Sequence, residues 1–483
     1  MIALTKSRLV QASQCQKRLW LETYQGEAAQ ERSYSQQRRI EQGIEVENYA
    51  RQYFPQGILI KGNNLEEKIQ ATQAALERGE RCLFEATFKF NNVLVKCDIL
   101  LQNESGEWEL IEVKSSTKVK DEYLQDLAIQ KYVLAGNDII LSSSQVMHIN
   151  RDCVYPDLSN LFIQEDVTEQ LKTVFSNLPQ LIRNSQNTLE QEQIPNINIG
   201  KHCDKPYPCP FKSFCWEGIE EPTILSIPNL RGQRLEQVNE LIAQGIYSLH
   251  DLPDDFPLTE KQAQAVQEKL NPEFRINEQG ILEKILQLEY PLYFFDFETL
   301  DPAIPRFEGL QPCQQFPFQY SCHILHQNGK LEYHTYLHEN DTDPREIIIQ
   351  SLLETLGKQG SIVVYNKSFE AQILKQLAEQ FPEYSSQLNA IIERLWDQLE
   401  VFKHDYQHPD FGGSNSLKKV LPVLVPEMSY DDLDVQGGDE AQAIWDLVIQ
   451  GKAGDQTEKM LADLRNYSEQ DTYAMVAIHR VLL

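Results

Sequence analysis

The sequence lacks long apolar runs, internal repeats and a nucleotide-binding glycine loop. Its longest apolar stretches, such as residues 290–295, are far shorter than a membrane span, so a membrane protein is not expected. The first twenty residues carry four basic side chains and no continuous apolar core, which argues against a signal peptide and predicts a cytoplasmic protein. The absence of a P-loop argues against an ATP-driven motor.

Basic residues are also scarce. The 44 Lys and Arg residues face 72 Asp and Glu residues, which gives a formal net charge of −28. Such a charge argues against a protein that coats nucleic acid non-specifically. It is compatible with a nuclease, because a nuclease site must be acidic to hold a metal ion. It predicts weak, salt-sensitive binding to nucleic acid without divalent ions.

The chain has 483 residues, which is too long for one ordinary core, so two or three domains are expected. Alternation of strand-like and helix-like segments predicts an α/β fold class. We expect a first α/β unit over residues 1–220, a helical linker module over 221–285 and a second α/β unit over 286–483. The strands expected in the first unit are 82–90, 93–101 and 108–114, followed by helices 121–134 and 167–182. Those expected in the second unit are 292–297, 318–325, 331–337 and 362–365.

One group of polar residues lies on two neighbouring strands of the first unit. Asp98 stands in VKCDIL, and Glu112 and Lys114 stand in LIEVKSS. Residues two apart on a strand face the same side, so Glu112 and Lys114 share a face on which Asp98 can converge. Two carboxylates and a lysine can bind Mg²⁺ and direct a metal-activated water at a phosphodiester. The alternative is a surface salt bridge on a half-exposed strand.

This segment resembles the PD-(D/E)-x-K nuclease core of the RecB family. The sequence SRLVQASQCQKRLWLE at residues 7–22 looks like the start of the iron–sulfur branch, which includes the CRISPR-associated RecB-like nucleases. The resemblance implies a restriction-endonuclease-like fold, metal roles for Asp98 and Glu112, and a water-activating role for Lys114. Glu85, on the adjacent strand, is a further candidate ligand.

Two features depart from that family. The family's upstream helix offers a His four residues after a Gly, whereas here Gly43 is followed by Glu45 and Glu47, so this ligand is a carboxylate or is missing. The family's Gln-x-x-x-Tyr helix is matched only by Gln130 and Tyr132, which have a different spacing. The identity of the auxiliary ligands therefore stays open.

A second group of acids begins in YFFDFETL, residues 293–300. Asp296 and Glu298 share one face of this strand, where two acids repel each other unless a cation lies between them. Glu370 follows a strand in VYNKSFE, and Tyr467 and Asp471 lie one helical turn apart in NYSEQDTYAM. The alternative is a strand end that opens to solvent.

The order of these motifs resembles the DEDD exonucleases of the DnaQ-like, RNase H-like fold, in the subtype with tyrosine. An uncharacterised DEDD-type domain found behind RecB-like nucleases is similar over most of residues 291–483, including FGGSNSLKKVLPVLVPEMSY at 411–430. The resemblance implies two metal ions held by Asp296, Glu298, Glu370 and Asp471, with Tyr467 orienting the attacking water. Glu370 stands where the family has Asp, which predicts a shifted second metal.

Three of the nine cysteines, Cys203, Cys209 and Cys215, lie in KHCDKPYPCPFKSFCW at residues 201–216. In a reducing compartment such a cluster indicates a metal centre rather than disulfides. Structural zinc usually takes two close C-x₂-C pairs, which are absent here, whereas a cubane cluster tolerates wider spacings. Zinc and unrelated core thiols remain alternatives. Core positions are expected for Cys82, Cys97, Cys153, Cys313 and Cys322.

The resemblance to the iron–sulfur branch suggests the fourth ligand. In that branch a cysteine near the start is completed by three cysteines after the catalytic core. This implies a [4Fe–4S] cluster on Cys15, Cys203, Cys209 and Cys215, which would tie the first helix to the end of the nuclease unit. A structural role is favoured over a redox role.

These observations predict two nuclease domains in one chain, both hydrolysing phosphodiester bonds with Mg²⁺ or Mn²⁺. The resemblance favours DNA over RNA, with single-stranded or frayed ends as substrate, in repair or in defence against foreign DNA. One alternative is an RNA-directed exonuclease. The other is a non-catalytic adaptor that binds DNA ends and keeps the cluster as a staple or redox sensor, which the missing His and Glu370 would suit. The oligomeric state is not predicted.

Overall fold

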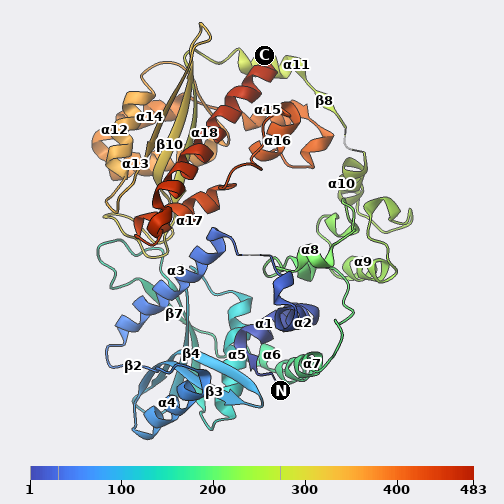
Figure 1. The fold of residues 1–483 in the computed structure, drawn as a ribbon, viewed down its shortest axis with the longest axis vertical. Helices are drawn as coiled ribbons and strands as arrows, with labels where there is room; N and C mark the ends of the chain where they lie inside the picture. The colour runs from blue at the N-terminus through green and yellow to red at the C-terminus, as the bar shows by residue number, and fades with distance from the viewer. Residues whose placement is uncertain (1, 31, 272) are drawn as a thin grey trace. The chain divides into compact units, whose positions relative to one another are not determined.

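The computed structural model describes residues 2–30, 32–271 and 273–483. These form two compact units. The first unit holds most of the chain up to Val266, and the second holds Gln267–Leu483 together with the short segments Ser33–Arg38 and Val154–Pro156. Each unit has its own mixed β-sheet and its own helices (Figure 1), so the expected α/β class is confirmed.

The sheet of the first unit has seven strands in the order β2-β3-β4-β5-β6-β7, with β1 beside β4. Strands β3, β4 and β5 form an antiparallel meander. Strand β5 pairs with β6 in parallel, and helix α5 connects the two strands in the sequence. The strands are β1 (Leu4–Thr5), β2 (Ile58–Leu59), β3 (Cys82–Phe90), β4 (Val93–Gln102), β5 (Trp108–Lys114), β6 (Leu141–Ile149) and β7 (Phe162–Asp166).

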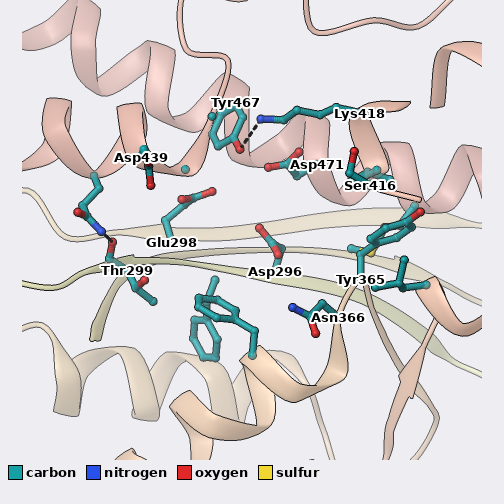
Figure 2. Close-up of a pocket in the computed structure, with 18 of the residues that line it drawn as sticks. Asp296, Glu298, Thr299, Tyr365, Asn366, Ser416, Lys418, Asp439, Tyr467 and Asp471 are labelled. Atoms are coloured by element: carbon teal, nitrogen blue, oxygen red, sulfur yellow. Dashed lines mark hydrogen bonds between the residues drawn. The ribbon is translucent and has the colours of Figure 1, made fainter. Parts of the chain in front are cut away.

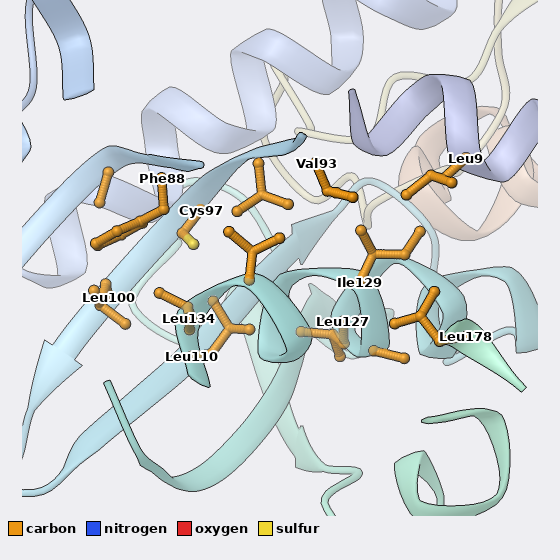
Figure 3. Close-up of a cluster of buried hydrophobic side chains, with 14 of the residues drawn as sticks. Leu9, Phe88, Val93, Cys97, Leu100, Leu110, Leu127, Ile129, Leu134 and Leu178 are labelled. Atoms are coloured by element: carbon orange, nitrogen blue, oxygen red, sulfur yellow. The ribbon is translucent and has the colours of Figure 1, made fainter. Parts of the chain in front are cut away.

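Helix α5 (Asp121–Ala135) covers one face of this sheet. Figure 3 shows apolar side chains from α1, α5 and the central strands meeting in one buried cluster. The other helices of more than one turn in this part of the chain are α1 (Lys6–Gln14), α2 (Gln16–Tyr24), α3 (Tyr34–Ala50), α4 (Leu65–Glu77), α6 (Leu171–Phe175), α7 (Leu178–Leu189), α9 (Gln233–Ala243) and α10 (Glu260–Leu270).

The helix expected over residues 167–182 is wrong in its extent. Val167 precedes the first helical turn, and the segment breaks into α6 and α7 between Phe175 and Leu178. Pro179 stands in the first turn of α7. Proline has no N–H to donate and favours the first turn of a helix, so it starts a new helix here rather than continuing α6.

The main sheet of the second unit has five strands in the order β11-β10-β9-β12-β13. Strands β9, β10 and β11 are antiparallel neighbours, whereas β12 and β13 run parallel to β9. The strands are β9 (Leu292–Leu300), β10 (Phe316–Leu325), β11 (Leu331–Leu337), β12 (Ile362–Val364) and β13 (Leu395–Asp397). A separate ribbon pairs β8 (Arg275–Ile276) with β14 (Tyr406–Gln407).

Helices cover both faces of the five-stranded sheet, which is why β9 and β10 are buried along nearly their whole length. In Figure 1 the long helix α18 (Thr457–Leu482) crosses one face. The others are α11 (Glu278–Ile285), α12 (Arg345–Thr355), α13 (Lys367–Gln380), α14 (Ser385–Glu393), α15 (Leu399–His404), α16 (Leu417–Leu424) and α17 (Gly438–Ile449). No helix of the described residues combines the length and the apolarity that a bilayer crossing requires.

Candidate functional site

A cavity of about 900 Å³ opens in the second unit beside β9. Its walls come from β9, from the turn between β12 and α13, and from helices α16 and α18 (Figure 2). The turn depends on Asn366, whose φ of 101° lies in the left-handed region that Asn tolerates better than most residues. Sequence-distant segments therefore meet around one hollow.

Three acids converge on this cavity. Asp296 and Glu298 project from the same side of β9, and Asp471 projects from α18. One carboxylate oxygen from each lies within 4.8 Å of the other two, a group that could hold a metal ion. Burial, and then the neighbouring carboxylates, raise the pKa values of Asp296 and Glu298 well above the ordinary range. Burial also raises the pKa of Asp471. A divalent cation would remove this repulsion.

Glu370 lies beside this group rather than within it. It stands in the first turn of α13, its residue is 1% exposed, and its carboxyl group is hydrogen-bonded to Asp296. Among the described residues, its Oε2 atom is buried without a hydrogen-bond partner. Burial and the charge of Asp296 raise the pKa of Glu370 well above its usual value. The longer side chain thus leaves one buried oxygen next to the trio.

Lys418 and Tyr467 also line this cavity, and Tyr430 contacts Asp471 beside them. The Tyr430 hydroxyl donates a hydrogen bond of 2.5 Å to Asp471 Oδ1. The Lys418 ammonium lies 3.3 Å from the Tyr467 hydroxyl (Figure 2) and about 5 Å from the centres of both tyrosine rings. Burial and the charge of Asp471 raise the pKa values of both tyrosines, so the hydroxyls stay protonated.

Sequence reasoning placed Tyr467 here but assigned no role to Lys418 or Tyr430. Both stand in the 411–430 stretch, which the family resemblance marked as a block without naming individual side chains. The signal available was the single Lys-Lys pair of α16 in an otherwise apolar helix. That signal does not say which distant tyrosine the lysine meets.

The acids predicted in the first unit meet where β4 and β5 pair. Ile99 pairs with Ile111, which brings Asp98 next to Glu112, and both acids are buried. Asp98 Oδ2 accepts a hydrogen bond of 2.9 Å from the backbone N–H of Val113. Burial, followed by the charge of Glu112, raises the pKa of Asp98 to about 7.

Glu112 is surrounded by donors. Its Oε1 atom accepts from the ammonium groups of Lys114 and Lys6, each at 2.7 Å, and its Oε2 atom accepts from Gln130 Nε2 at 2.6 Å. Lys114 also lies 2.9 Å from Asp126 Oδ2. Burial alone would raise the pKa of Glu112, but the two ammonium groups outweigh it and hold this pKa far below its usual value.

Sequence reasoning missed Lys6 and Asp126, and it gave Gln130 no firm role. Lys6 stands 106 positions before Glu112, so no local pattern links them. Asp126 and Gln130 are four apart on α5, a spacing that puts both on one helix face toward β5. That spacing was the one readable signal for these contacts.

The two auxiliary candidates have different surroundings. Glu85 has a φ of 56° within β3, and its carboxylate pairs with Arg51 at 2.7 Å, Lys68 at 3.3 Å and Lys96 at 3.6 Å. Three cations therefore already compensate Glu85. Burial raises the pKa of Glu47, and the negative charge of Glu112 raises it further. Glu47 is therefore close enough to Glu112 for the two charges to interact.

The four cysteines proposed as ligands line one narrow cavity in the first unit. Cys15 lies between α1 and α2, and Cys203, Cys209 and Cys215 come from the compact segment after α7. His202 hydrogen-bonds the side chains of Cys15 and Cys203. None of the four cysteines forms a disulfide, and among the described residues no three of their sulfurs lie within 4.8 Å of one another.

The known proteins that this chain resembles have names that state no activity. Over 224 residues the chain is 30% identical to the uncharacterized protein UU173 of Ureaplasma parvum, with 41% of this chain and 32% of that protein covered. Over 206 residues it is 32% identical to the uncharacterized protein MG366 homolog of Mycoplasma pneumoniae, with 38% and 31% covered. The chain thus spans about a third of the length of these relatives.

A crystal structure of SSO0001 aligns with 45% of this chain and 87% of its own, at 14% identity. The TM-score is 0.22, which is too low to establish a common fold. The family model that matches is described as a domain of unknown function (DUF2779), and it covers residues 293–416. This match starts at the strand that carries Asp296 and Glu298 and ends at the turn into α16, so it includes these two acids and Glu370 but neither Tyr467 nor Asp471.

Proposed function

We propose that this protein is a metal-dependent nuclease that hydrolyses phosphodiester bonds, with its catalytic centre at Asp296, Glu298 and Asp471. One observation carries the proposal: three buried acids from two distant segments share a cavity of about 900 Å³ and lie close enough to ligate one cation. Oxygen donors in such a cluster suit Mg²⁺ or Mn²⁺. The expected RNase H-like, DnaQ-like fold accords with the strand order β11-β10-β9-β12-β13.

Divalent ions at these acids would supply an activated water and neutralise charge on the leaving oxygen. Glu370, with its unpaired buried oxygen, is the fourth acid of the proposed set. Tyr467 would orient the attacking water through its hydroxyl, which Lys418 holds from the far side. This arrangement supports the tyrosine-containing DEDD subtype and a 3′–5′ exonuclease.

In the first unit we propose a RecB-like, restriction-endonuclease-like core closed by an iron–sulfur cluster. The chemistry of the donor set supports the cluster, because four thiols line one cavity. Structural zinc usually takes two close C-x₂-C pairs, which the segment lacks, whereas the wider spacing of Cys203, Cys209 and Cys215 suits a [4Fe–4S] cubane. The cluster would tie α1 to the segment after α7.

The proposed substrate is DNA with a single-stranded or frayed 3′ end, with RNA as the alternative. The test is degradation of end-labelled single-stranded and double-stranded DNA and RNA in Mn²⁺, with wild type, Asp296→Ala and Lys114→Ala compared. We expect stepwise shortening from the 3′ end that Asp296→Ala abolishes. If wild type degraded none of these substrates, the nuclease proposal would be wrong and a DNA-end adaptor would replace it.

A further inference from the structure

The carboxylate of Glu112 has no vacant oxygen in the first unit. Two ammonium groups reach its Oε1 atom, and an amide reaches its Oε2 atom, all at 2.6–2.7 Å. In the neighbouring Asp98, one carboxylate oxygen accepts a hydrogen bond from the backbone N–H of Val113. A divalent ion that used Glu112 Oε1 would therefore compete with the two ammonium groups that are already bonded there.

Lys6 is the donor that the family resemblance does not account for. It begins α1 directly after β1, and β1 pairs with β4 through Leu4 and Thr5. Thr5 caps the helix by accepting from the backbone N–H of Arg8. At the other end of α1, Gln14 donates to the carbonyl oxygens of His202 and Tyr207. Both ends of α1 are thus fixed, and the ion pairs with Glu112 and Asp126 position the Lys6 ammonium.

The two acidic sites of the chain differ in how their charge is balanced. In the first unit, Lys6 and Lys114 match the negative charges of Glu112 and Asp126 through ion pairs of 2.7–3.6 Å. In the second unit, Asp296, Glu298 and Asp471 form no ion pair among the described residues, and Lys418, which lines the same cavity, is bonded to Tyr467 and to the carbonyl of Gln436. The chain's own lysines thus compensate Glu112 in the first site, whereas the three acids of the second site have no such ion pairs among the described residues.

We propose that Lys6 is a built-in counter-ion that keeps divalent cations off Glu112, so that the first site rests without metal and the second site alone binds Mn²⁺ or Mg²⁺ at concentrations that support hydrolysis. The inference rests on the proposed function for its assignment of metal chemistry to Asp296, Glu298 and Asp471. It assigns this role to Lys6 rather than to Lys114, because Lys114 lies 2.9 Å from Asp126 while Lys6 lies 3.6 Å from it, so Glu112 is the closer partner of Lys6.

The test measures Mn²⁺ binding by electron paramagnetic resonance in a protein whose second site is disabled by Asp296→Asn and Asp471→Asn together. Lys6→Met is added to this background, and Lys96→Met serves as the matched control. Lys96 stands on β4, two residues before Asp98, and pairs with Glu85. Its replacement by Met therefore also removes one positive charge from this sheet but leaves the donors to Glu112 in place. Lys6→Gln is the second variant if Lys6→Met does not fold.

The background protein should bind no Mn²⁺ at concentrations that saturate wild type. Lys6→Met should gain one Mn²⁺ site with affinity raised on the order of tenfold or more, Glu112→Gln should remove that site, and Lys96→Met should gain none. Tight Mn²⁺ binding by the background protein that Glu112→Gln removes and Lys6→Met leaves unchanged would overturn the inference. Exonuclease activity of wild type is measured separately, so failure of the proposed function is distinguishable.

Discussion

At the residue scale, the chain uses the same carboxylate chemistry in two different electrostatic settings. Glu112 is ion-paired to lysines on its own unit, which holds its pKa down. Asp296 and Glu298 face each other and Asp471 without such pairing, which drives their pKa values up. A divalent cation is expected to stabilise the second setting more, because its three acids have no ion pairs among the described residues, whereas Glu112 is already paired with two lysines.

The first prediction concerns Asp471. Asp471→Asn should lower Mn²⁺-dependent nuclease activity by at least about 100-fold, because it removes one of three carboxylates that share the cation. The control is Glu469→Gln, an exposed acid on the same helix, which should keep wild-type activity. Equal loss in both variants would show that general negative charge, rather than the trio, matters.

The second prediction concerns the Tyr467 hydroxyl. Tyr467→Phe should reduce kcat by about 10- to 100-fold while leaving Mn²⁺ affinity unchanged, since the hydroxyl positions water and is not one of the acids of the trio. Tyr473→Phe, on an exposed turn of the same helix, is the matched control. Weaker Mn²⁺ binding by Tyr467→Phe would contradict the positioning role.

Residue identities could be read from the sequence where a motif carried them, as for Asp296, Glu298 and Asp471. Contacts between distant positions could not. Lys6 and Glu112 are 106 positions apart, and Lys418 and Tyr467 are 49 apart. The contact between Lys6 and Glu112 depends on how β1 pairs with β4, and the contact between Lys418 and Tyr467 depends on how α16 packs on α18. No local sequence pattern encodes either arrangement.

At the scale of elements, α18 and β10 bury two imidazoles. His479 packs against Phe294 with a ring separation of 5.4 Å, and among the described residues neither of its ring nitrogens has a partner. His323 bonds Thr472 through Nδ1 at 2.9 Å. Burial lowers the pKa of each to about 4, so both are neutral in the folded protein.

The third prediction follows from these two residues. Since their pKa values are lower in the folded state than the unfolded value of about 6.5, the unfolded state binds more protons between pH 6.5 and 4. The stability contributed by these two imidazoles is therefore full above pH 6.5 and falls as the pH drops through this window, by about 2 kcal/mol per imidazole at pH 5. Urea unfolding at pH 7.5 and 5 measures this, and His479→Leu should halve the histidine-dependent loss. A loss unchanged in His479→Leu would contradict the assignment.

The fourth prediction concerns the cysteine segment. Cys15→Ser should remove the visible absorbance and the bound iron of protein purified without oxygen, because one of four thiolates is lost. Cys153→Ser, a buried thiol of the same unit outside that cavity, should keep the colour. Full colour in Cys15→Ser, or zinc as the metal in wild type, would contradict the cluster.

Element boundaries were predictable where strands alternate or end at polar turns. The strands Cys82–Phe90, Trp108–Lys114 and Leu331–Leu337 match their predicted bounds. Strands β6 and β7 were not predicted, because β6 contains three consecutive serines and β7 is mostly exposed and acidic. Their strand state comes from pairing with β5 and with each other, a tertiary effect that outweighs local propensity.

At the scale of the whole molecule, two units with separate sheets and separate cores carry two separate acidic sites. The cysteine cavity belongs to the first unit and the acid trio to the second. Loss of the proposed cluster should therefore impair the first unit and spare the exonuclease activity that we propose for the second. With a net charge of −28, the chain should bind nucleic acid weakly until divalent cations are present.

The most direct test of the account is Mn²⁺-dependent degradation of a 5′-labelled single-stranded DNA by wild type, Asp296→Ala and Glu112→Gln. The account predicts shortening from the 3′ end by wild type and by Glu112→Gln, and none by Asp296→Ala. Activity that survives in Asp296→Ala and disappears in Glu112→Gln would contradict it, because hydrolysis would then belong to the first unit.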